Sequence, residues 1–174
     1  MKIFVNDKVY VQNNDLAYFM RGVNGMKVPS SIFNKVFGDI FIVNNENRYD
    51  FVEFTSPQEV EFFKNCDWIV DYDTLNQMND DEIIKYGTQI NEERNKTAKR
   101  FNALSEEQRK DLYMQASIKM DLLEYKLYSV RDFLLHRQGH LDFPLPEDVN
   151  NISICNNIES KKPSVLKRIL GYFK

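Results

Sequence analysis

Three carboxylates lie close together in the first half of the chain, where they could hold a metal ion. Asp67, Asp71 and Asp73 surround the apolar run 68–70, which is typical of a buried strand. Carboxylates at the end of a strand can bind Mg²⁺ and support phosphoryl chemistry. Aspartate is also common in turns. No basic or second acidic motif accompanies these three carboxylates. A metal-dependent hydrolase is therefore one alternative, and ordinary turn formation is the simpler interpretation.

Two histidines form the second possible metal site. His136 and His140 are four residues apart, a spacing that would place both rings on one face of an unbroken helix. Gly139 falls between them, where the helix is expected to end, and no third ligand is evident. We therefore expect two polar residues at a helix terminus, where positive charge is favourable, and no cofactor.

Nucleophilic and nucleotide-binding chemistry has no support in the motifs. Cys66 follows a predicted helix, so no helix N-terminus is placed to lower the pKa of its thiol. The glycines are scattered, and neither a P-loop nor a G-x-G-x-x-G or G-x-S-x-G motif occurs. Cys66 and Cys155 stand far apart without a C-x-x-C, which favours a reducing compartment over a disulfide framework or zinc site. A non-catalytic protein is expected.

The overall composition is that of a folded protein with no strong electrostatic preference. Hydrophobic residues make up 43% of the chain and charged residues 28%, typical of globular proteins. A net charge of −3 does not provide the basic surface of a general nucleic-acid binder. No apolar run is long enough to span a bilayer. We expect a cytoplasmic protein, with a membrane-peripheral location as an alternative.

The pattern of apolar residues predicts an α+β fold that begins with a small antiparallel β lobe over residues 1–72. Asn6 and Asp7 separate two β-prone runs and tolerate the positive φ of a hairpin turn. Ser56 and Glu59 form a capping box that starts a helix ending near Lys64. The lobe is expected to contain two hairpins and one further strand, at 3–5, 9–11, 39–43, 49–54 and 68–70, with helices at 15–21, 32–37 and 57–64.

Residues 73–141 are predicted to form a long antiparallel helical hairpin packed on the lobe. Asn79 and Ser105 are the N-caps of two helices, which run to about Asn102 and Gln138, and Gly139 stops the second. The second helix carries a seam with coiled-coil spacing: Ala116, Met120, Leu123, Leu127, Val130 and Leu134. A short break between two such helices favours antiparallel packing.

The second helix carries more apolar residues than one partner helix can cover. Most of the surplus is expected to meet the β lobe, and the remainder is a candidate interface with another protein or with a second copy of the chain. The interaction candidates are Tyr113, Ile118, Tyr125, Tyr128 and Phe133.

The C-terminal part is expected to be an irregular linker over 142–163, followed by a basic amphipathic helix over 164–174. Residues on the two sides of this helix are candidates for docking: Val165, Leu166, Ile169, Leu170 and Phe173 on the apolar side, with Lys167 and Arg168 on the other. Such a helix can fold back on its own body, lie on an anionic membrane surface or dock on a partner.

Together these features favour a non-catalytic protein-binding module that acts through the helical hairpin. The size and composition also suit a small accessory or inhibitor protein of phage or mobile-element type. A peripheral membrane protein anchored by residues 164–174 and the metal-dependent hydrolase remain the alternatives.

Overall fold

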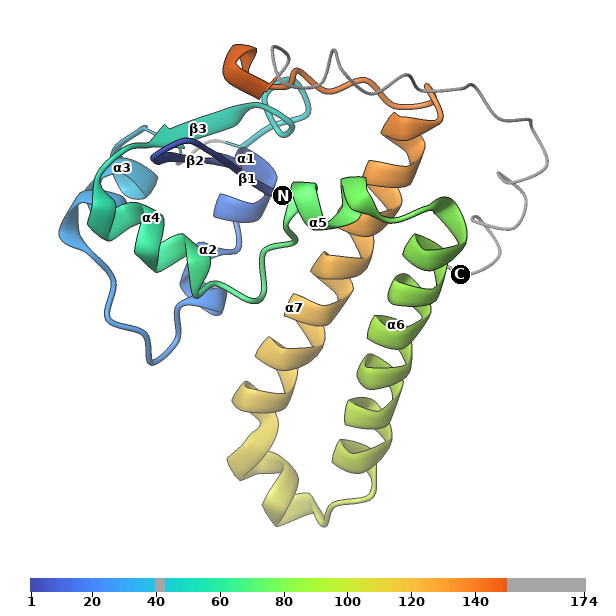
Figure 1. Cartoon of the computed structure of the whole chain (residues 1–174). Helices are drawn as coiled ribbons and strands as arrows, with labels where there is room; N and C mark the ends of the chain where they lie inside the picture. The colour runs from blue at the N-terminus through green and yellow to red at the C-terminus, as the bar shows by residue number, and fades with distance from the viewer. Residues whose placement is uncertain (40–42, 150–174) are drawn as a thin grey trace.

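The computed structural model of the chain describes residues 1–39 and 43–149. An N-terminal lobe of strands and short helices lies beside two long helices that project well past it (Figure 1). Helices α6 (Asp80–Asn102) and α7 (Glu106–Arg137) form an antiparallel hairpin in which α7 lies next to the lobe and α6 lies on its far side. The predicted α+β fold, an antiparallel β lobe followed by a long helical hairpin, is confirmed.

The lobe is built on a three-stranded antiparallel sheet in the order β1-β2-β3. Strands β1 (Lys2–Val5) and β2 (Lys8–Gln12) form the predicted hairpin, and Asn6 in its turn has a φ of 53°. Strand β3 (Phe51–Phe54) pairs with β2, with Val9 opposite Phe54. The expected second hairpin is thus corrected in the described residues: the partner of β3 is β2, and Asp39 ends a helix instead of beginning a strand.

Five short helices complete the lobe and its junction with the hairpin. The helix predicted over 15–21 is divided into α1 (Asn13–Leu16) and α2 (Phe19–Gly22), and the one at 32–37 is longer, as α3 (Ser30–Asp39). Helix α4 (Pro57–Lys64) has the predicted bounds, and α5 (Tyr72–Gln77) precedes the hairpin. A Cβ at Gly22 would lie 2.1 Å from the Trp68 ring, so α2 packs there with glycine alone.

Capping residues fix where the main helices begin. The reciprocal side-chain and backbone hydrogen bonds of a capping box are present at Ser56 with Glu59, at Asn79 with Glu82 and at Ser105 with Gln108. Each box satisfies two backbone N–H groups that have no partner inside the helix. Gly139, with a φ of 72°, follows the end of α7 as predicted. The starts of α4, α6 and α7 are therefore set by local sequence.

The strand predicted at 68–70 is not formed. Trp68, Ile69 and Val70 are all buried, but their backbone turns after α4, and the segment touches the sheet through one parallel bridge between Lys2 and Asp71. A strand would alternate its side chains between two faces, whereas here three in succession enter the core. The buried Lys2 ammonium donates to the carbonyls of Phe63 and Cys66, at 2.8 Å each, and holds the end of α4 against β1.

The sheet separates two apolar clusters, because neighbouring side chains of a strand point to opposite faces. One cluster joins Ile3 and Tyr10 to α5, to the lobe-proximal parts of α6 and α7, and to Phe143. The other joins Val9 and Val11 to helices α1–α4 and Trp68. The hairpin is thus anchored to the lobe near one end.

Several sequence-based expectations fall outside the described residues. These are residues 40–42 of the expected strand at 39–43, the linker from 150 to 163, and the amphipathic helix over 164–174 with its candidate docking residues.

Candidate functional site

The three carboxylates near Trp68 do not form a metal site. Asp71 is the N-cap of α5, where its Oδ1 accepts from the backbone N–H of Asp73 at 2.9 Å and from that of Thr74 at 3.4 Å. Burial, and second the charge of Asp71, raises the pKa of the Asp73 carboxyl. Asp67 is exposed in the turn before. No group of three or more histidine, cysteine, aspartate or glutamate side chains in the described part of the chain is arranged to hold a metal ion.

The two histidines point to different surroundings. The His136 ring stacks on Phe143, with 3.9 Å between the ring centroids, and its Nδ1 lies 3.1 Å from the Leu141 carbonyl oxygen. His140 is exposed beyond Gly139, after the helix has ended. His136 therefore fastens the chain that follows α7.

The Cys66 thiol is equally unsuited to nucleophilic chemistry. It is fully buried, and burial raises its pKa to about 12. A protonated, enclosed thiol is a poor nucleophile.

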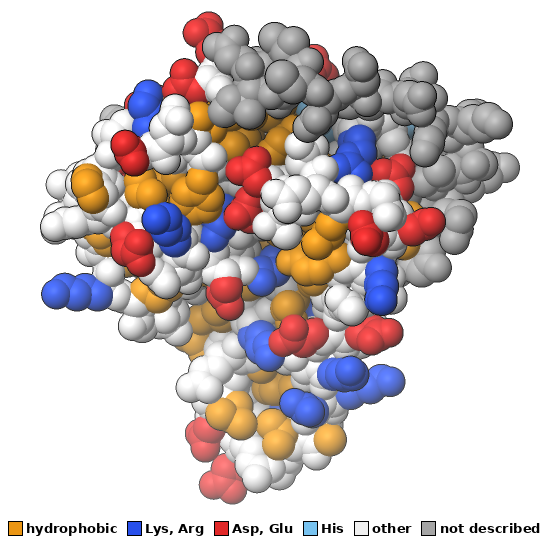
Figure 2. All heavy atoms as spheres, viewed as in Figure 1, with side chains coloured by type: hydrophobic (Ala, Val, Ile, Leu, Met, Phe, Trp, Pro, Cys, Tyr) orange, Lys and Arg blue, Asp and Glu red, His pale blue; other side chains and the backbone are white. Residues whose placement is uncertain are grey.

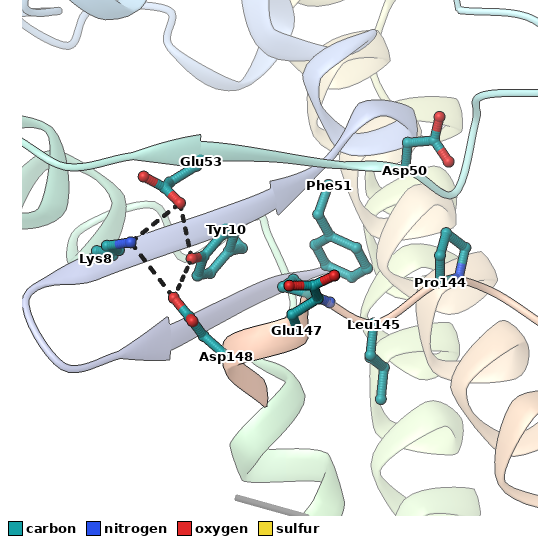
Figure 3. Close-up of a pocket in the computed structure, with 10 residues that line it drawn as sticks. Lys8, Tyr10, Asp50, Phe51, Glu53, Pro144, Leu145, Glu147 and Asp148 are labelled. Carbon is teal, nitrogen blue, oxygen red and sulfur yellow. Dashed lines mark hydrogen bonds and ion pairs between the residues drawn. The ribbon is translucent and has the colours of Figure 1, made fainter. Parts of the chain in front are cut away.

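A cavity of about 540 Å³ lies over one face of β2 and β3, next to the segment that follows α7 (Figure 3). Its polar centre is formed by Lys8 and Tyr10 from β2, Glu53 from β3 and Asp148 from the following segment. The Tyr10 hydroxyl lies 2.8 Å from Glu53 Oε2 and 2.7 Å from Asp148 Oδ2. The Lys8 ammonium lies 3.3 Å and 3.4 Å from the same two oxygens.

These four side chains satisfy one another. Burial and the hydrogen bonds to both carboxylates raise the pKa of Tyr10, which keeps the phenol protonated and unable to act as a base. Hydrogen bonds from Tyr10 and Lys8 lower the pKa of Asp148, so this carboxylate is a poor general acid. The cluster closes the segment that follows α7 onto β2, and we interpret it as a structural clamp.

The part of the hairpin that extends past the lobe presents a different kind of surface. We call residues 91–122 the projecting hairpin. None of these residues is buried, although the seam residues Ala116 and Met120 lie within it. From Leu123 onward α7 has eight buried residues. Two helices without further cover cannot enclose their seam, so the projecting hairpin has no enclosed core.

Two ion pairs across the hairpin mark its two broad faces. Arg94 bonds Glu124 at 2.9 Å, and Glu93 bonds Lys119 at 2.9 Å. Because consecutive residues point about 100° apart on a helix, Glu93 and Arg94 lie on different sides of α6. Lys119 and Glu124 are five residues apart on α7 and so point about 140° apart. The two pairs therefore bridge α6 and α7 on different sides of the hairpin.

The face with the Arg94–Glu124 pair also carries the Glu106–Lys110 pair of α7, at 3.2 Å, so these charges balance one another, and we call it the neutral face. Tyr128 extends its polar network by donating to Glu124 at 2.7 Å. Hydrogen bonding from Tyr128, with Arg94 next, lowers the pKa of Glu124, which keeps this carboxylate ionised at neutral pH. Spacings of three and four place the following uncharged residues here: Ile84, Thr88, Asn91, Asn95, Ala98 and Asn102 of α6, with Tyr113, Ser117, Met120 and Tyr128 of α7.

The face with the Glu93–Lys119 pair carries further lysine and arginine side chains and is called the charged face. It includes Gln89, Lys96 and Arg100 of α6, with Gln115 and Lys126 of α7, by the same spacing. On the side of the hairpin visible in Figure 2, charged side chains of both signs alternate with hydrophobic ones.

The five interaction candidates are divided between the inside and the outside of the chain. Tyr125 is 4% exposed and Phe133 1% exposed, because both pack between α7 and the lobe. Tyr113 is 64% exposed and Tyr128 40%, both on the neutral face. Ile118 is half-buried. It lies on the side of α7 that faces the lobe nearer the C-terminal end of the helix.

Sequence reasoning did not single out Met114, which is 70% exposed. It lies one turn before Ile118 and two turns before Leu122, which packs on the lobe. This spacing of four was the available signal, since it places Met114 on the lobe-facing side beyond the end of the lobe.

Comparison with known proteins gives no relative for this arrangement. No protein-family model, curated protein or solved structure matches the chain. Among the described helices, none is both long and apolar enough to cross a membrane.

Proposed function

We propose that the protein is a non-catalytic protein-binding module whose binding surface is the neutral face of the helical hairpin. One observation carries the proposal: from residue 91 to residue 122 no side chain is buried, although an apolar seam runs through this segment. A helix normally buries its apolar stripe against other packed elements. A bound protein would supply such an element.

The composition of the neutral face supports the same function. Protein interfaces are depleted in charge at their centre and enriched in tyrosine and methionine. The neutral face offers Tyr113, Tyr128 and Met120, and its two ion pairs, Arg94–Glu124 and Glu106–Lys110, are internally balanced. Large exposed aromatic side chains are the residues that most often dominate binding energy.

Site-specific photocrosslinking in cells of the native host tests this function. The photoreactive p-benzoylphenylalanine replaces Tyr113 on the neutral face, and the matched control replaces Gln115 on the charged face of the same helix. Both positions are exposed, so both report what lies beside them. We expect a discrete protein adduct from position 113 and none of comparable yield from position 115.

Two results would contradict the proposal. One is the absence of any adduct from position 113, and the other is the same adduct in equal yield from position 115. Thermal melts of both variants check that the chain is folded. We expect both to melt as the unmodified chain does, because neither side chain contributes to the core.

A further inference from the structure

We infer that an apolar and acidic stripe of α7, where the helix extends past the lobe, is covered by residues 161–174 of the same chain. This inference goes beyond the proposed function, because the stripe lies on another side of the hairpin than the neutral face. We call it the outer stripe, and its members are Glu107, Asp111, Met114, Ile118, Asp121 and Leu122. Residues 161–174 lie outside the described part of the chain, and it is their sequence that identifies them as the occupant.

Within the described part of the chain, the apolar residues of the outer stripe are left uncovered where the lobe ends. The stripe continues the side of α7 on which Tyr125 and Ser129 are buried against the lobe, because its members follow at spacings of three and four. Leu122 still packs on the lobe, Ile118 is half-buried, and Met114 is 70% exposed. Exposure therefore rises along one continuous stripe as α7 passes the lobe, which leaves an unpartnered helix face (Figure 1).

The charged residues of the outer stripe are all acidic. Asp121 pairs with Arg21 of α2, close to the lobe. Glu107 and Asp111 are exposed, and among the described residues neither takes part in an ion pair. They are four residues apart on one side of the helix, where like charges destabilise each other. A basic segment with an apolar side would relieve this repulsion and cover Met114.

The charge of residues 161–174 is opposite to that of the rest of the chain. Residues 1–149 contain 25 acidic and 18 basic side chains, a net charge of −7. Residues 161–174 contain no acid and five basic residues: Lys161, Lys162, Lys167, Arg168 and Lys174. The apolar residues of this segment fall on one side of a helical wheel: Val165, Leu166, Ile169, Leu170 and Phe173. Because basic residues stand at both ends of the segment, either direction of packing brings a cation to the acidic end of the outer stripe.

The connection to the lobe favours this segment over a separate molecule. Val149, at the end of the described part, packs in the same apolar cluster as Leu134 of α7. Ile118 lies about 24 Å from Leu134 along the helix, whereas residues 150–163 can span up to about 46 Å when extended. The outer stripe is therefore within reach. A tethered segment has an effective concentration in the millimolar range, so it competes well with a free partner of similar affinity.

Photocrosslinking within the purified full chain tests the inference. The photoreactive p-benzoylphenylalanine replaces Met114 on the outer stripe. The matched control replaces Tyr113, which is similarly exposed but points about 100° away on the helix. After irradiation of a dilute sample, we expect mass spectrometry to find position 114 joined to a peptide from residues 161–174 of the same chain. The yield of this link from position 113 should be at least about threefold lower.

A reversal of charge tests whether the acidic residues contribute to the contact. Asp111→Lys changes the outer stripe, and Glu92→Lys makes the same change on α6, away from it. Both positions are exposed, and circular dichroism melts check that both variants fold. Asp111→Lys should lower the yield of the link from position 114 at least about threefold, because attraction is replaced by repulsion. Glu92→Lys should leave the yield unchanged.

The absence of a link between position 114 and residues 161–174 in the folded chain would overturn the inference. An equal yield from position 113, or an equal loss from Asp111→Lys and Glu92→Lys, would overturn it as well. Mixing isotope-labelled and unlabelled chains separates links within one chain from links between two. A link found only between two chains would assign the outer stripe to a second copy and contradict the inference. Irradiation of the same probe in cells of the native host would contradict it if an adduct with another protein replaced the link.

Discussion

Helix α7 carries one apolar seam along its length, but its two halves meet different surroundings. Leu123, Leu127, Val130 and Leu134 are buried between α6 and the lobe, whereas Ala116 and Met120 of the same seam stay partly exposed. The spacing of three and four is the same in both halves. Periodicity therefore identifies the side on which helices pair, while burial requires a further layer on the other side of the helix.

The difference in burial shows which half of the hairpin contributes more to the stability of the fold. Side chains in the lobe-proximal half remove large apolar areas from water, at about 25 cal/mol per Å². The projecting hairpin depends on the cap at Ser105, worth about 1 kcal/mol, and on exposed ion pairs worth about 0.2–1 kcal/mol each. The outer half is therefore the part whose stability most needs a partner.

Truncation of one aromatic residue in each half should give the largest contrast. Phe133→Ala removes a ring that is 1% exposed and packs edge-on against Tyr72, at 5.2 Å between centroids. We expect it to lower the free energy of unfolding by about 3–5 kcal/mol. Tyr113→Ala, at an exposed position, should change the stability of the monomer by about 0.5 kcal/mol or less.

Urea unfolding at a concentration where the chain is monomeric measures both values. Equal losses from Phe133→Ala and Tyr113→Ala would show that the projecting hairpin has a packed core of its own. The contrast between the two halves of α7 would then be wrong.

Removal of single hydroxyl groups should show the same contrast on a smaller scale. The Tyr125 hydroxyl donates to the backbone carbonyl of Asn14 where α7 meets the lobe, and its ring lies against Tyr18. Tyr125→Phe leaves that carbonyl without its partner, which should cost about 1–2 kcal/mol. Tyr128→Phe removes an exposed bond to Glu124 and should cost about 0.5 kcal/mol or less.

Chemical denaturation of these two isosteric variants, with circular dichroism as the readout, measures the difference. If Tyr128→Phe proved as costly as Tyr125→Phe, the neutral face would contribute to the fold of the single chain. Its assignment as a binding surface would lose its basis.

Local signals were sufficient to predict where the three helices with capping boxes begin. Ser56, Asn79 and Ser105 each begin a helix as predicted, because a capping box is a short-range arrangement of side chain and backbone. The strand at 68–70 was predicted wrongly because its three apolar residues are buried for a tertiary reason, the enclosure of a turn between α4 and β1. Apolar runs of this length do not distinguish a strand from a buried turn.

The candidate binding surface was predictable in part. Tyr113 and Tyr128 are apolar positions off the seam, and both are exposed. Tyr125 and Phe133 have the same character in the sequence, yet they lie under the lobe. Only the extent of the lobe along α7 separates the two pairs, and this distance depends on the packing of α2 and α5 against α7. The clamp of Lys8, Tyr10, Glu53 and Asp148 was not predicted, because its members come from three separate segments.

The pH dependence of two ion pairs, one in the clamp and one on the projecting hairpin, should give the smallest differences. The pKa of Asp148 is lowered by Tyr10 and then Lys8, and the pKa of Glu93 is lowered by Lys119. A carboxyl whose pKa is lower in the folded chain stabilises the fold above its unfolded pKa of about 4. That contribution disappears as the pH falls through the folded pKa.

Two variants test this pH dependence. Asp148→Asn keeps an acceptor for Tyr10 but removes the charge, and Glu93→Gln is the matched change outside the lobe. At neutral pH both variants should have a lower melting temperature than the unmodified chain. The decrease should be larger for Asp148→Asn, because Asp148 has two partners. Both decreases in melting temperature should become smaller between about pH 5 and pH 3, as thermal melts at several pH values would show. If the decrease for Asp148→Asn stayed constant over this pH range, the charges of the clamp would not contribute to stability. They would then not be what holds the segment following α7 on the sheet.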